Sequence, residues 1–255
     1  GAALAYYHLA LGNKKINTID TMKGSYLGPE FDDISVEQSL KTLDANFIKL
    51  NRNEMLETVS DEIKNGKAIG WFQGKMEFGP RALGSRSILA DPRSEKTQKN
   101  LNLKIKFRES FRPFAPSILK DHCSNYFKLN AESPYMLIVS DVKDEIRLKP
   151  TDQENLLFGI EKLNIKRSTI PAVTHVDYSA RVQTVEKKTN LIFYDLINKF
   201  YEKTGFPLLV NTSFNIRGEP IVCSVEDAFN CFMGTNLDIL VENNFILKKN
   251  DQKEN

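Results

Sequence analysis

The stretch from residue 191 to 215 constrains the fold most, because it predicts a helix, a glycine that ends the helix and a strand in immediate succession. Apolar residues recur at helical spacing over 191–203, and Gly205 stands where such a helix would end. Residues 207–210 then predict a buried strand, which runs directly into polar sequence. Helical and strand patterns side by side exclude an all-α or all-β class and predict an α/β domain.

Further elements alternate along the chain with the same two periodicities. Helices are predicted over residues 1–12, 53–65, 95–104 and 224–233, the last with Ser224 and Asp227 as a capping box. Strands are predicted over 68–72, 114–119, 135–142, 237–241 and 245–247, with two more strand-like pieces in 170–185. The polar stretch 146–167 predicts a surface excursion. With 255 residues, 41% of them hydrophobic, the chain can form one large domain with mixed strands, or one domain and a short appendage.

Positive charge is concentrated in one segment of a chain whose net charge is only +2. Between Lys75 and Arg112 there are ten Lys or Arg against four Asp or Glu, which leaves a net −4 for the remainder. A local positive field on a nearly neutral protein indicates an anionic ligand. The alternative is a solvated basic face.

Cysteine usage and hydropathy bear on the compartment. The three cysteines are widely spaced and form no CxxC pair, which predicts reduced thiols in a cytoplasm rather than a disulfide framework or a zinc site. There is no apolar run of membrane-spanning length and no signal segment. The first residues lack an initiating Met and continue a helical pattern, so we expect a piece of a longer protein.

The segment 75–93 combines turn residues with cationic side chains. Gly79, Pro80 and Gly84 permit a tight backbone, and Pro80 is placed to begin a short helix whose amides would face an anion. The segment supplies four donors suited to phosphate or carboxylate oxygens: Lys75, Arg81, Arg86 and Arg93. Together these features predict an anion site.

The next segment, 104–116, interleaves cations with phenylalanines. Phe107, Phe111 and Phe114 could stack on bases in a nucleic-acid track, or wall a phosphate pocket. Alternatively, they could be ordinary core residues with arginines at the rim.

Two polar groups lie further along. His175 is close to Asp177, but no nucleophile pattern accompanies them, so a hydrolytic triad is not supported. Asn211, Ser213 and Asn215 follow a buried strand, at the position where α/β sheets bind ligands. The alternative is a turn that satisfies its own backbone.

Taken together, long motifs resemble the NodU-type O-carbamoyltransferases. They occur in family order at 70–93, 106–109, 111–116, 133–136, 171–177, 180–183 and 211–222. The resemblance implies a YrdC-like α/β domain, a mixed sheet with helices packed on it, preceded by an actin-like metal-binding domain. In that interpretation residues 1–22 are the last helix of the actin-like domain, 23–50 a linker and 51–255 the YrdC-like domain.

The resemblance also implies a reaction. Such domains bind carbamoyl phosphate and ATP and form carbamoyl-adenylate, and the preceding domain passes the carbamoyl group to an acceptor hydroxyl. The positions that match the family's catalytic residues are Arg81, Lys106, Arg112, Arg181 and Ser213. Those expected to bind substrate are Lys75, Arg86, Met136, His175, Asn211 and Asn215. Mg²⁺ is expected with ATP, and iron only in the preceding domain. The alternative is a nucleic-acid-binding YrdC-like module related to transfer-RNA modification.

Overall fold

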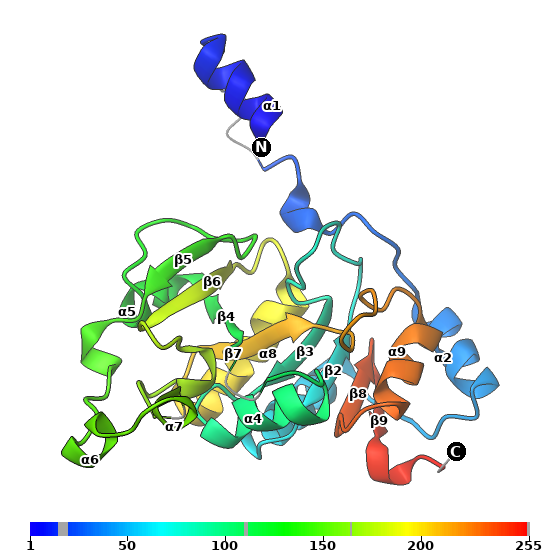
Figure 1. Ribbon diagram of the computed structural model, residues 1–255. Coiled ribbons are helices and arrows are strands. Elements are labelled where there is room, and N and C mark those ends of the chain that lie inside the picture. The colour runs from blue at the N-terminus through cyan, green and yellow to red at the C-terminus, as the bar shows by residue number, and fades with distance from the viewer. Residues whose placement is uncertain (15–19, 110–111, 164, 254–255) are drawn as a thin grey trace.

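A nine-stranded sheet runs through the protein (Figure 1). The computed structural model describes residues 1–14, 20–109, 112–163 and 165–253. The strands are β1 (Ile48–Lys49), β2 (Ile69–Phe72), β3 (Arg86–Ala90), β4 (Ala115–Leu119), β5 (Ile138–Asp141), β6 (Ser179–Val185), β7 (Leu208–Ser213), β8 (Ile239–Glu242) and β9 (Phe245–Lys248). Across the sheet they follow the order β1, β9, β8, β2, β3, β7, β4, β6, β5. β2 is parallel to β8 and β4 to β6, and the other neighbours are antiparallel, which confirms the predicted mixed sheet.

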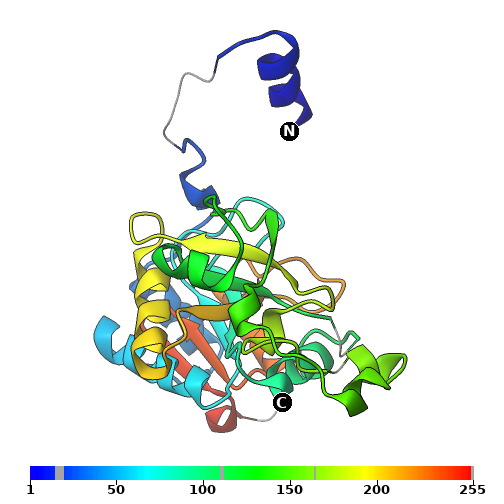
Figure 2. The ribbon, with the colours of Figure 1, turned by 90° about the vertical axis from the view of Figure 1, so that its left-hand side faces the viewer.

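Helices cover both faces of this sheet (Figure 1, Figure 2). One face carries α3 (Arg52–Lys64) and α8 (Leu191–Thr204), and the other carries α2 (Asp33–Thr42), α4 (Glu95–Lys104) and α9 (Val225–Met233). Because successive side chains of a strand point to opposite faces, Trp71 packs in the apolar layer under α3 and α8, and Phe72 packs in the layer under α2, α4 and α9. Two apolar layers therefore hold the sheet between helices.

Local sequence sets the ends of the longer helices. Asn51 and Glu54 form a reciprocal capping box at the start of α3, and Ser224 and Asp227 form the predicted one at α9. α8 ends at Gly205, which has φ +76°, a conformation that glycine adopts without steric cost. The predicted helices are confirmed over 53–65, 95–104, 191–203 and 224–233.

The segment 23–50, predicted as a linker, is part of the packed fold. α2 lies on α9, and its Val36 and Leu40 are fully buried. β1 pairs with β9 at the edge of the sheet, with Ile48 opposite Ile246. The glycines, proline and acids of this segment are typical of a linker, but two apolar residues four apart suffice to anchor a helix.

Two local predictions are wrong. No helix begins at Pro80: residues 79–85 form bends that lead into β3, a strand that the sequence interpretation did not include. In the 170–185 region only β6 is a strand, because residues 171–173 form a single helical turn. The short helices are α1 (Ala2–Ala5), η1 (Tyr6–Ala10), η2 (Lys23–Ser25), η3 (Lys120–His122), α5 (Cys123–Tyr126), η4 (Asp144–Ile146), α6 (Asp152–Asn155), α7 (Ile160–Leu163), η5 (Pro171–Val173) and η6 (Lys249–Asp251).

The N-terminal helix carries no buried residue in either α1 or η1, and it lies apart from the sheet in both views (Figure 1, Figure 2). Among the described residues, no helix combines the length and the apolar character needed to cross a bilayer.

Candidate functional site

Four segments meet at one end of the strands, at the edge of the sheet where β3, β4 and β6 begin and β7 ends. Ser87 pairs with Ser213 and Ala115 with Asn211, so the starts of β3 and β4 lie beside the end of β7. β6 runs parallel to β4 and therefore begins at the same edge. The segments brought together are 77–85, 106–109 with 112–114, 174–178 and 213–219.

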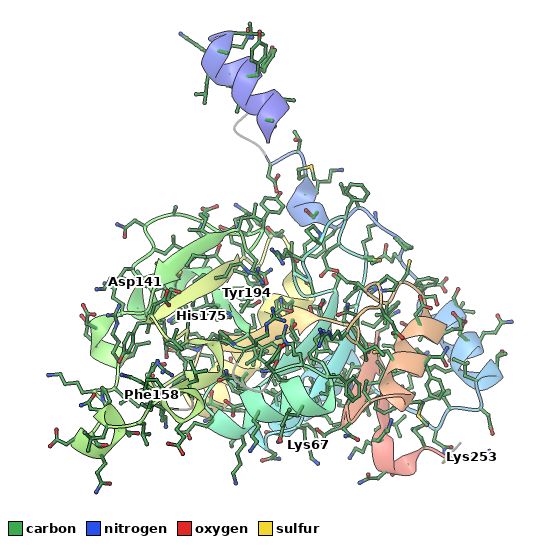
Figure 3. All side chains as sticks on the ribbon, viewed as in Figure 1. Lys67, Asp141, Phe158, His175, Tyr194 and Lys253 are labelled. Atoms are coloured by element: carbon green, nitrogen blue, oxygen red, sulfur yellow. The ribbon has the colours of Figure 1, made fainter. Side chains whose placement is uncertain are left out.

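A cavity of about 880 Å³ opens at this edge. Its volume falls in the range of ordinary small-molecule sites. One carboxylate, Glu95, lines the cavity, against eight Lys or Arg: Arg81, Lys96, Lys99, Arg108, Arg112, Lys166, Arg167 and Arg181. His175, labelled in Figure 3, is also a lining residue. The cavity therefore concentrates positive charge.

Arg81 and Arg181 are the two cations of this cavity that have a buried nitrogen without a hydrogen-bond partner in the described part of the chain. In each of them this nitrogen is Nε. Burial lowers the pKa of Arg181, and the positive charge of Arg81 lowers it further, so the two guanidinium groups interact. Like charges held together with unsatisfied donors are costly unless an anion binds between them.

His175 is exposed at the rim of the cavity, close enough to Arg181 for the two groups to interact electrostatically. Partial burial of the ring lowers its pKa and the charge of Arg181 lowers it further, while Asp177 partly opposes both effects. Asp177 accepts hydrogen bonds from the backbone N and the Oγ of Ser179, at 3.0 and 2.7 Å. The lowered pKa favours the neutral imidazole, which can donate or accept a hydrogen bond.

Lys106 forms a second cluster, at the end of β7, and does not line the cavity. Its Nζ donates to the carbonyl of Ser213, to the carbonyl of Asn215 at 2.9 Å, and to Asn215 Oδ1 at 2.8 Å. Ser213 Oγ donates to the same Oδ1 at 2.7 Å. Burial lowers the pKa of Lys106 to about 7, and the charge of Arg108, which lines the cavity, contributes. The two clusters are thus electrostatically linked through Arg108.

Arg86 is placed away from the cavity. It is fully buried, its guanidinium stacks 3.5 Å above the ring of Phe72, and it donates to the carbonyls of Gln73, Gly74 and Pro29 at 3.1 to 3.2 Å. Arg93 likewise binds Asp91 through two nitrogens. These two arginines therefore hold loops and do not line the cationic cavity, and their part in anion binding stays a prediction.

The remaining predicted residues surround the site without lining the cavity. Asn211 is buried, and its Nδ2 donates to the carbonyl of Ala82 at 3.1 Å. Met136 is buried against Leu83. Lys75 is exposed. Of the predicted residues, the structure brings Arg81, Arg112, Arg181 and His175 together around the cavity.

The sequence interpretation missed several cavity cations. Lys166 and Arg167 belong to the stretch predicted only as a surface excursion, whereas Lys96 and Lys99 are counted in the basic segment 75–112 but are not named as site residues. Their charge was a visible signal, but their distance in sequence from Arg81 hid their common location.

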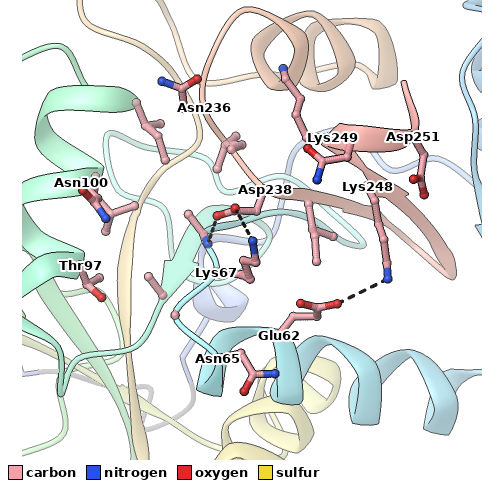
Figure 4. A pocket seen from close by; sticks show the side chains of 18 residues that line it. Glu62, Asn65, Lys67, Thr97, Asn100, Asn236, Asp238, Lys248, Lys249 and Asp251 are labelled. Carbon is pink, nitrogen blue, oxygen red and sulfur yellow. Dashed lines mark hydrogen bonds and ion pairs between the residues drawn. The ribbon is translucent and has the colours of Figure 1, made fainter. Parts of the chain in front are cut away.

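A second cavity, of about 660 Å³, lies where β2 and β8 begin and where β3 and β9 end (Figure 4). It has three lysines and three carboxylates, and two of the lysines are paired, Lys67 with Asp238 at 3.1 Å and Lys248 with Glu62 at 3.6 Å. Lys249 donates to the last carbonyls of α9. This cavity therefore lacks the excess positive charge of the first.

The donor set of the cationic cavity does not fit a metal ion held by the protein. Within residues 1–14, 20–109, 112–163 and 165–253, no group of three or more His, Cys, Asp or Glu is arranged to hold one. Mg²⁺ prefers carboxylate and water oxygens, and here one carboxylate stands among eight cations. We assign no protein ligand to the Mg²⁺ expected with ATP.

The protein is thus a mixed α/β domain with a cationic cavity at its strand ends. Comparison gives the family: the sequence profile described as carbamoyltransferase C-terminus matches residues 60–249. The chain belongs to this family.

Three relatives illustrate the similarity. The protein sll1178 of Synechocystis sp. is 52% identical over 257 residues, covering 100% of this chain and 42% of that protein. The nodulation protein NolO of Bradyrhizobium diazoefficiens is 40% identical, over 88% of this chain and 38% of that protein. The 3'-hydroxymethylcephem-O-carbamoyltransferase of Amycolatopsis lactamdurans is 36% identical, over 66% and 28%. The chain therefore spans well under half the length of these relatives.

Proposed function

We propose that this chain binds carbamoyl phosphate and ATP and joins their carbamoyl and adenylyl parts as carbamoyl-adenylate. One observation carries the proposal: Arg81 and Arg181 line the cavity, each has a buried Nε without a hydrogen-bond partner among the described residues, and their charges repel each other. Guanidinium groups match phosphate oxygens in both charge and geometry. Membership of the carbamoyltransferase C-terminus family makes carbamoyl phosphate the anion to test first.

The chemistry needs charge stabilisation rather than a protein nucleophile. In the proposed reaction sequence, water first cleaves carbamoyl phosphate into carbamate and inorganic phosphate, which leaves. A carbamate oxygen then forms a bond to the α-phosphorus of ATP, and the bond from that phosphorus to the pyrophosphate oxygen breaks, so that pyrophosphate leaves. Negative charge grows on the phosphoryl oxygens, where Arg81, Arg112 and Arg181 would stabilise it. Mg²⁺ would neutralise charge on the nucleotide when bound with it.

The second half of the reaction belongs to the proposal for the whole protein. One relative is named as an O-carbamoyltransferase, which acts on a hydroxyl oxygen. We infer that the carbamoyl group formed here is passed to an acceptor hydroxyl by a further, iron-containing part of a longer protein.

The competing nucleic-acid function has weaker support. Phe114 is buried, and the guanidinium of Arg108 lies 4.7 Å from its ring centroid, so this ring cannot stack on a base. Phe111 lies outside the described residues. Phe107, half exposed, is the one remaining candidate of the three. A cationic cavity of about 880 Å³ suits a small anion better than an extended strand of nucleic acid.

The test is to mix the protein with ATP, Mg²⁺ and carbamoyl phosphate and to measure pyrophosphate release and carbamoyl-adenylate by mass spectrometry. We expect both products. Arg81→Ala and Arg181→Ala should each weaken carbamoyl phosphate binding about 10- to 100-fold, because each removes a charge-assisted contact. Lys64→Ala, which changes an exposed lysine outside the cavity, is the matched control.

Absence of both products together with absence of ATP and carbamoyl phosphate binding would overturn the proposal. RNA binding with a steep salt dependence would then favour the alternative.

A further inference from the structure

The carboxylate of Glu77 is buried inside the loop that carries Arg81. The side chain is 4% exposed, and its Oε1 accepts the backbone N–H of Leu83 at 2.6 Å and of Ser85 at 2.8 Å. The N–H of Arg86 is shared between the two oxygens, at 3.3 and 3.2 Å. The amides expected to face a bound anion therefore face the protein's own carboxylate.

Buried side chains from other elements hold the carbonyls of the same loop. Asn211 donates to Ala82 O, and Gln183 Nε2 donates to Leu83 O at 2.8 Å. The hydroxyl of Tyr26 also donates to Leu83 O, at 2.7 Å. Residues 82–86 are thus held through their amides on one side and their carbonyls on the other.

Arg81 lies directly before this fixed segment. Unlike the backbone groups of 82–86, its buried Nε has no hydrogen-bond partner in the described part of the chain. It interacts unfavourably with Arg181, so the loop must hold it against electrostatic repulsion. Backbone hydrogen bonds to a carboxylate are strong enough to contribute to such a position.

We propose that Glu77 is a positioning residue, whose carboxylate shapes the loop so that Arg81 is presented to the anion opposite Arg181. This inference rests on the proposed anion site. A carboxylate suits the task because it only accepts hydrogen bonds. A glutamine would turn an N–H₂ group toward at least one backbone N–H, and the loop would have to move.

The experiment measures the dissociation constant of inorganic phosphate by NMR titration in a double-mutant cycle. The variants are Glu77→Gln, Arg81→Ala and the double variant. We expect Glu77→Gln to weaken phosphate binding at least about tenfold, equivalent to about 1.4 kcal/mol. The double variant should bind no more weakly than Arg81→Ala alone, because Glu77 acts through Arg81.

Each outcome decides between specific alternatives. Wild-type affinity in Glu77→Gln, or effects that multiply in the double variant, would overturn the positioning role while the anion site stands. If the wild-type protein binds no phosphate and Arg81→Ala changes nothing, the proposed function itself fails. Where Glu77→Gln does not fold, Glu77→Asp carries the same test, because it keeps the charge and shortens the reach of the carboxylate; its loss of affinity must likewise vanish in the Arg81→Ala background. A lower melting temperature with unchanged phosphate affinity marks Glu77 as structural only.

Discussion

Lys106 is a buried cation whose partners are neutral oxygens. It is 5% exposed, and its Nζ is surrounded by oxygens of Ser213 and Asn215 rather than by a carboxylate. Hydrogen bonds of this kind satisfy its donors but do not neutralise its charge. The physical consequence is a pKa lowered to about 7 by burial, close to neutral pH.

This lowered pKa predicts how stability depends on pH. The folded protein releases the Lys106 proton near pH 7, whereas the unfolded chain keeps it to about pH 10.4. Between those values the unfolded state binds more protons, so the free energy of unfolding rises with pH, by up to about 1.4 kcal/mol per unit for one proton. Lys106→Met should remove this rise. Urea unfolding at pH 7 and pH 9 measures it, with Lys99→Met, an exposed lysine, as the control. An equal rise in wild type and Lys106→Met would contradict the prediction.

At the scale of elements, the loop before β3 is shaped by one glycine as well as by Glu77. Gly84 has φ +106°, and a Cβ at this position would lie 2.1 Å from Cδ1 of Phe193 on α8. Neither the backbone conformation nor the space permits a side chain here.

Gly84→Ala should therefore destabilise the protein by about 3 kcal/mol or more, since backbone strain and overpacking add. Gly218→Ala is the matched control: φ is +86°, but no atom lies within 4 Å of the added Cβ, so only the strain of about 1–2 kcal/mol remains. Chemical denaturation of both variants gives the comparison. An equal decrease in the free energy of unfolding in both variants would contradict the prediction, because it would mean that Phe193 moves aside at no cost.

The same elements show what a sequence can reveal. The caps at Ser224 and Gly205 are local patterns, so α8 and α9 could be predicted from the sequence. The loop at 79–85 could not, because the partner of its amides is Glu77, a carboxylate that the sequence presents as one more charge in a basic segment. The burial of Arg86 could not be predicted for a related reason: spacing in sequence does not tell which arginines turn inward once the segment becomes a strand.

At the scale of the whole molecule, the cationic cavity depends on topology. Arg81 and Arg112 lie in the loops before β3 and β4, and Arg181 is the third residue of β6; the three meet because these strands begin at the same end of the sheet. The family motifs identified these residues, but the charge pattern alone did not relate Arg181 to the basic segment. Strand order is a long-range property, and a single sequence carries no direct record of it.

The role of residues 23–50 is also a property of the whole molecule, and one helix tests it. α2 buries Leu40 completely, in the same apolar layer as residues of α9 and β8, whereas Ile34 on the same helix is 77% exposed. If the segment were a linker, truncating either side chain would leave stability unchanged. Because α2 belongs to the core, Leu40→Ala should lower the free energy of unfolding by about 2–5 kcal/mol. Ile34→Ala should change it by less than about 0.5 kcal/mol. Thermal and urea unfolding of the two variants measure the difference, and equal stability would return the segment to the linker interpretation.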